Sequence, residues 1–183
     1  MKTSCRRSTI STLLSALFAL TFICPTVVSL AQTPNEPYAE RTAYIISRID
    51  EVVTKELQTA WQLSGNGYEK TEVLILLYRM PDGSISARLQ GRSGQYRRFD
   101  FRWSPAIIAV LHTHPNGDEP RPLGQDLESA DRLRIPVFTI TRRGMYVYDP
   151  ASKKISLVQG GLDWLDYTKW IKARQATAQE AVR

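Results

Sequence analysis

The spacing of apolar residues along the chain predicts a helix near its start. From Pro37 to about Leu63, apolar side chains recur every three or four positions, which is typical of one amphipathic helix. The glycines that follow Ser64 are expected to end this helix. Its predicted apolar face comprises Ile45, Ile46, Ile49, Val52, Val53, Leu57 and Ala60.

Downstream, apolar runs and alternating stretches predict a series of strands. Residues 73–80 form a nearly continuous apolar run that ends at Pro81-Asp82-Gly83, and residues 84–91 alternate, so we expect a hairpin. Residues 96–103 alternate aromatic and charged side chains, which predicts a further strand. The remaining strands are expected at residues 106–111, 137–141, 145–148 and 155–158.

Two more helices complete the predicted element order. Residues 125–134 space their leucines and alanine for one helix face, and a C-terminal helix is expected after Gly160-Gly161. This last helix would take its apolar contacts from Leu162, Trp164, Leu165 and Trp170. Helices thus bracket and interrupt a set of strands, which predicts an α+β domain with a mixed β-sheet flanked by helices.

The first 31 residues have the pattern of an export signal. Lys2, Arg6 and Arg7 precede an apolar stretch, and Ser29-Leu30-Ala31 provides small residues for cleavage. We therefore expect a cleavable signal at residues 1–31, a linker at 32–36, one domain at 37–183, and a periplasmic or secreted location. The alternative, a retained membrane anchor, is disfavoured because the apolar run is short and interrupted by Pro25.

Removing the signal changes the cysteine count and the charge. Cys5 and Cys24 both lie in it, so the mature chain would have neither a disulfide nor a thiolate metal site. Its 21 basic and 18 acidic residues would leave a net charge of +3, too small an excess to indicate a nucleic-acid partner. After cleavage we also expect no stable membrane anchor.

Two histidines follow the apolar stretch at residues 106–111. In extended backbone the side chains of His112 and His114 face the same way, and Asp126 begins the next predicted helix. Two imidazole nitrogens and one carboxylate are typical of a catalytic zinc site, whose fourth position stays open for water. The competing interpretations are Asp126 as a helix N-cap and Asp118 as a rival ligand.

His112-Thr113-His114-Pro115, followed by Pro122-Leu123-Gly124-Gln125-Asp126, resembles the His-x-His-Pro…Ser-x-x-Asp signature of JAMM metallopeptidases, the JAB/MPN family. The resemblance covers roughly residues 72–149. It implies a JAB/MPN-like (cytidine deaminase-like) sandwich, Zn²⁺ on His112, His114 and Asp126, and a peptide or protein substrate cleaved at an amide or isopeptide bond. It also implies a glutamate base; Glu72 fits best, and Glu69 competes.

One position departs from the family pattern. Leu123 stands where the family has a serine that helps to hold the substrate oxygen, and removing such a donor typically costs ~100- to 1000-fold in turnover. Asn116, Gln125 or a main-chain N–H is expected to bind substrate in its place. Three functions remain open. The first is an exported zinc hydrolase, and the second is a JAB-like domain without activity that serves as a binding or scaffold module of the cell envelope or a secretion system. The third is a secreted effector or toxin of this fold.

Overall fold

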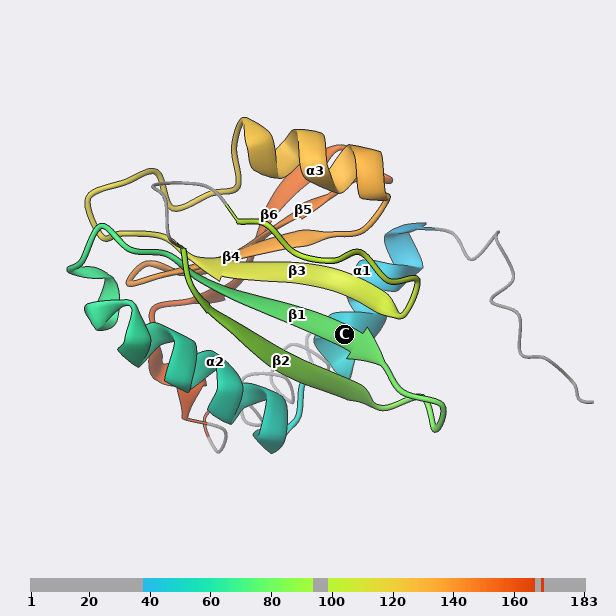
Figure 1. The fold of residues 1–183 in the computed structure, drawn as a ribbon, viewed down its shortest axis with the longest axis horizontal. Coiled ribbons are helices and arrows are strands. Elements are labelled where there is room, and N and C mark those ends of the chain that lie inside the picture. Colours follow the sequence, from blue (N-terminus) through green and yellow to red (C-terminus); the bar gives the residue numbers. More distant parts are fainter. Residues whose placement is uncertain (1–37, 94–98, 167–168, 170–183) are drawn as a thin grey trace, which may run out of the picture. The chain divides into compact units, whose positions relative to one another are not determined.

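A six-stranded mixed sheet organises the molecule (Figure 1). The computed structural model describes residues 38–93, 99–166 and 169, and the expected signal and linker lie outside them. The strand order is β2-β1-β3-β4-β5-β6, with every neighbouring pair antiparallel except β3 and β4. The strands are β1 (Val73–Arg79), β2 (Ile85–Arg92), β3 (Ile107–Thr113), β4 (Val137–Thr141), β5 (Gly144–Asp149) and β6 (Lys154–Gly160).

Helices cover both faces of this sheet, in agreement with the α+β prediction. In Figure 1, α2 lies against one face and α3 against the other. The elements are α1 (Tyr38–Ser47), α2 (Glu51–Leu63), α3 (Gln125–Leu133) and the 3₁₀ turns η1 (Gly65–Gly67) and η2 (Asp163–Leu165). Within the described residues, no helix has the length and apolar character needed to cross a bilayer.

The single helix expected from Pro37 to Leu63 is wrong, because the chain breaks into α1 and α2. A new helix begins after Asp50, whose carboxylate accepts a 2.9 Å hydrogen bond from the Val53 amide and so caps the start of α2. The predicted buried face largely survives the break. Ile45, Ile49, Val53, Leu57 and Ala60 are all buried, whereas Val52 is 66% exposed.

The strand expected at residues 96–103 is also wrong over its described part, because residues 99–103 form no strand. This segment joins none of the six strands of the sheet, in which β1 pairs with β2 and β3. Phe99 and Phe101 instead pack as half-buried side chains against the apolar cluster beneath α3. The alternation therefore indicates which side chains are buried, but it does not indicate that the backbone pairs as a strand.

The core has two parts, one on each face of the sheet. On β1, Val73, Ile75 and Leu77 join the cluster beneath α1 and α2, while Leu74 and Leu76 join the cluster beneath α3. Because both faces of this strand are buried, its sequence is an almost continuous run of apolar residues.

Only the first part of the helix predicted after Gly160-Gly161 lies within the described residues. Trp164 and Leu165 are buried in the cluster beneath α1 and α2, but they belong to the short turn η2. Trp170 lies outside the described residues.

Candidate metal centre

The crossover from β3 through α3 to β4 builds the site. His112 is the penultimate residue of β3 and His114 follows its end, so strand alternation points both imidazoles toward the α3 face. Thr113 points the opposite way, and its hydroxyl accepts a 3.0 Å hydrogen bond from the Val73 amide. Because β4 runs parallel to β3, α3 must return along the sheet, and its first turn brings Asp126 beside the histidines.

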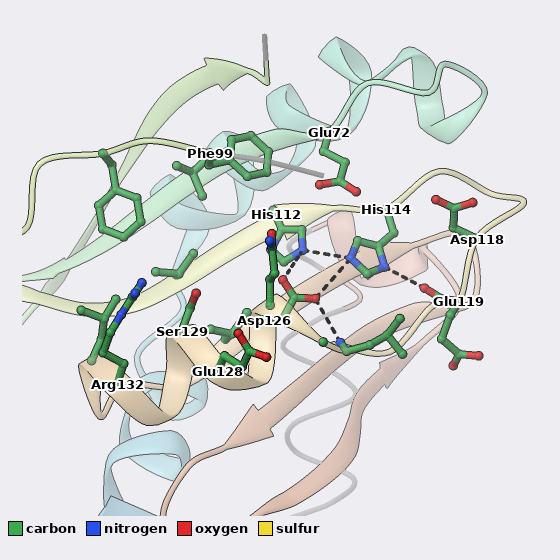
Figure 2. A pocket seen from close by; sticks show the side chains of 18 residues that line it. Glu72, Phe99, His112, His114, Asp118, Glu119, Asp126, Glu128, Ser129 and Arg132 are labelled. Carbon is green, nitrogen blue, oxygen red and sulfur yellow. Dashed lines mark hydrogen bonds and ion pairs between the residues drawn. The ribbon is translucent and has the colours of Figure 1, made fainter. Parts of the chain in front are cut away.

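The three side chains converge at short distances (Figure 2). The two histidine Nε2 atoms are 2.9 Å apart, and Asp126 Oδ1 lies 3.3 Å from Nε2 of His112. Asp126 Oδ2 lies 3.7 Å from Nε2 of His114. One ligand atom from each residue fits within a group no wider than 4.8 Å. The described residues therefore contain a group that could hold a metal ion.

The hydrogen bond made by the other nitrogen of His114 favours a cation at this point. His114 Nδ1 lies 2.7 Å from the main-chain oxygen of Glu119, and a carbonyl oxygen can only accept, so Nδ1 carries the proton. In the neutral ring, Nε2 then presents a lone pair to His112 and Asp126. Metal-ligating histidines commonly have such a second hydrogen bond, which fixes both tautomer and orientation.

The protonation of His112 also suits ligation. Burial lowers the pKa of its imidazole to about 4, and nearby His114 adds to the decrease, while the negative charge of Asp126 opposes it. His112 is therefore neutral near pH 7, and an unprotonated nitrogen is the form that binds metals.

Asp126 is not the N-cap residue of α3, so that alternative is wrong. The N-cap is Gly124, and Asp126 lies within the first turn of the helix. Its Oδ2 accepts a 3.1 Å hydrogen bond from the Leu123 amide, which ties the preceding loop to the carboxylate. The same carboxylate faces both histidines, so its orientation is set before any ligand binds.

A cavity of about 740 Å³ opens beside this group. Glu72 lines it, is only 4% exposed, and points its carboxylate toward the two histidines in Figure 2. Its position follows from the pairing of β1 with β3: Leu74 lies opposite His112, and Glu72 is two residues earlier, on the same face. Asp118 also lines the cavity but does not belong to the group of three candidate ligands.

Two other predicted residues lie outside the cavity lining. Glu69 is half-exposed and forms a 3.0 Å ion pair with Arg92. Asn116 donates a 3.0 Å hydrogen bond from its side chain to the main-chain oxygen of Asn66, and its own amide donates to Gly67. Its side chain therefore packs against the η1 turn, away from the cavity.

Leu123, by contrast, does line the cavity, with 42% of its surface exposed. Its side chain offers no hydrogen-bond donor, and its main-chain N–H is directed to Asp126. Leu123 therefore presents no hydrogen-bond donor to the cavity, in contrast to the serine of the family signature.

Ser129 and Arg132 line the cavity from α3 but were not among the predicted site residues. They follow Asp126 at successive steps of three, and residues three apart are neighbours on a helix surface. That spacing was available in the sequence as a signal.

No protein-family model and no curated protein matches this chain. The resemblance to JAMM metallopeptidases stays a prediction drawn from the residues themselves.

Proposed function

We propose that the chain is an exported, zinc-dependent hydrolase of the JAMM type that cleaves an amide or isopeptide bond in a peptide or protein. The observation that supports this most strongly is the convergence of His112, His114 and Asp126 at one end of a cavity that also contains a buried glutamate. Export rests on the signal pattern of residues 1–31.

The donor set fits zinc. Two neutral imidazoles and one carboxylate are the ligands of many catalytic zinc sites, and the hydrogen bond from His114 to Glu119 provides outer-shell support. Zinc, when bound there, would lower the pKa of water toward ~7 and supply hydroxide near neutral pH.

The remaining chemistry belongs to Glu72. In this proposal its carboxylate accepts a proton from the attacking water and returns it to the nitrogen of the leaving amine. Burial at the cavity wall keeps this carboxylate close to the histidines, whereas the alternative base, Glu69, is held by Arg92 at the surface.

The test begins with zinc content, measured by elemental analysis of the purified full chain. We expect about one zinc per parent chain and little in His114→Ala. Asp118→Asn is the matched control, because Asp118 lines the same cavity outside the ligand group, and it should retain zinc. Absence of zinc from the parent after zinc is supplied would overturn the proposal.

The second half of the test is turnover on a library of fluorogenic peptide amides. Glu72→Gln should lower kcat at least ~100-fold while zinc content stays unchanged, because it removes a proton acceptor without touching the ligands. Glu69→Gln should change neither quantity. Equal turnover in the parent and Glu72→Gln would show that Glu72 is not the base.

A JAB-like binding or scaffold module without activity is the second candidate. It is favoured by one observation: Leu123 provides no side-chain donor at the position where the family signature has serine. Stoichiometric zinc with no turnover on any peptide would favour this alternative.

A further inference from the structure

The cavity extends well beyond the candidate metal centre, and its far end has a different character. Two residues before His112 on β3, Val110 lines the cavity, and its partner on β4 is Val137. Two strand residues span ~7 Å, so the apolar lining formed by Val110 and Val137 lies about 7 Å along the sheet from His112. Leu133 adds to this apolar lining, whereas Phe99 lies near the metal centre, with its ring centroid 5.9 Å from that of His112.

The direction of α3 places a cation at this apolar end. The helix runs back along β3, so the six residues from Asp126 to Arg132 carry the chain ~9 Å from the ligand end. Figure 2 shows Asp126, Ser129 and Arg132 in succession on the same helix, with Arg132 farthest from His114. The strand and the helix therefore give similar separations.

Arg132 differs from the rest of the lining in charge. It carries the one permanent positive charge among the described lining residues, which include the carboxylates of Glu72, Asp118, Glu119, Asp126 and Glu128. Its side chain is exposed, and within the described residues its guanidinium makes no hydrogen bond or ion pair. A guanidinium beside an apolar lining is suited to bind a carboxylate through two parallel hydrogen bonds.

We infer that Arg132 is a specificity-determining residue that binds a carboxylate of the peptide substrate, two to three residues from the bond that is cleaved. The spacing follows because an extended peptide advances ~3.3–3.6 Å per residue, and ~7–9 Å separates the two ends of the cavity. The inference rests on the proposed function for its ligand class, a peptide. The carboxylate is either an aspartate or glutamate side chain or the C-terminus of the peptide.

The simpler interpretation is that Arg132 only complements the carbonyl end of α3, since it lies in the last turn. Arg134 provides the matched control. It is the C-cap of the same helix and has the same charge, but it does not line the cavity. Arg134→Gln therefore removes an equal charge from the same helix end and leaves the proposed contact in place.

Binding is measured separately from cleavage, in the zinc-loaded full chain carrying Glu72→Gln. The probes are fluorescent octapeptides of alanine and leucine with a C-terminal amide, in which one Asp, or one Asn, occupies each position in turn. A third probe has no Asp and ends in a free carboxylate. Fluorescence anisotropy gives each Kd, and mass spectrometry maps cleavage of the same peptides by the chain with Glu72 intact.

We expect Asp at one or two adjacent positions, or the free C-terminus, to improve Kd roughly tenfold over its neutral counterpart. Adding Arg132→Gln should abolish this preference, Arg132→Lys should keep part of it, and Arg134→Gln should keep it whole. Bonds cleaved two to three residues from the preferred carboxylate would support the inference fully.

The other outcomes are distinct. A preference that depends on Arg132, with no peptide cleaved, would support the carboxylate site and contradict the hydrolase. Cleavage without any preference for a carboxylate, or with a preference that survives Arg132→Gln, would overturn the inference and leave the hydrolase standing. No binding of any probe would overturn the inference.

Discussion

At the scale of single residues, His112 links the candidate site to the stability of the fold. Its side chain is 3% exposed, and it is neutral near pH 7 because burial lowers its pKa to about 4. In the unfolded chain the same group titrates near its ordinary value of 6.5. Without metal, the folded and unfolded states therefore bind different numbers of protons at moderately acidic pH.

The sign of the effect follows from this difference. As the pH falls below ~6.5, the unfolded chain takes up a proton that folded His112 does not bind. The contribution of His112 to the free energy of unfolding should therefore decrease until about pH 4 and then level off. The loss from this group should reach about 3 kcal/mol at most. Above ~6.5 it contributes no pH dependence.

Urea denaturation of the zinc-free full chain between pH 4 and 7.5 measures this loss. His112→Gln cannot titrate, so its stability should fall less over the same range. Parallel profiles for parent and variant would contradict the assigned protonation of His112.

Glu72 and Glu69 are two candidate bases that differ in where the fold places their carboxylates. Three positions separate them in the sequence, and both precede the same strand, so either could be chosen as the base. The fold buries Glu72 in the cavity wall and pairs Glu69 with Arg92 at the surface.

At the scale of elements, the contact of β5 with β6 depends on one glycine. Gly144 begins β5 at a φ of 134°, a backbone conformation that residues with a Cβ rarely adopt. A Cβ built there would lie 2.0 Å from the carbonyl oxygen of Gln159. Gly160, its partner on β6, has no atom within 4 Å of the corresponding position.

We therefore expect Gly144→Ala to lower the free energy of unfolding by about 2 kcal/mol or more, because both the conformation and the contact oppose a side chain. Gly160→Ala should change it by less than about 1 kcal/mol. Urea denaturation compares the two variants with the parent. Similar losses in both would show that the close approach of the strands does not limit this position.

The elements that the sequence analysis placed wrongly share one cause. Apolar spacing continues through residues 48–50, yet the Asp50 carboxylate caps a new helix there. Alternation at residues 99–103 resembles a strand, yet this segment joins no strand of the sheet. Periodicity reports which side chains are buried, and it does not report whether the backbone continues or finds a partner.

At the scale of the whole molecule, a metal bound by His112, His114 and Asp126 would join the sheet to α3. Binding to the folded state alone stabilises it by RT ln(1 + [L]/Kd), or ~3 kcal/mol when free zinc is 100-fold above Kd. We expect zinc to raise the Tm of the parent and EDTA to reverse the shift. Differential scanning calorimetry checks this, and His114→Ala should show almost no response.

An equal rise in Tm for the parent and for His114→Ala would place the stabilising ion elsewhere. It would leave the geometry of the three side chains without a demonstrated ligand.

The features that can be predicted from the sequence alone are local. Most strands, α3, the shared direction of His112 and His114, and the candidate ligand Asp126 follow from periods of two and 3.6 residues and from residue types. The export signal was also predicted from local pattern, and it lies outside the described residues.

Which distant residues meet depends on how the strands pair in the folded chain. The antiparallel pairing that sets Leu74 opposite His112 brings Glu72 to the site, and the parallel pairing of β3 with β4 makes α3 return past the histidines and carry Arg132 to the apolar end. Strand pairing joins segments tens of residues apart, and the burial of both sheet faces selects it. Neither condition is contained in the short-range pattern from which the elements were predicted.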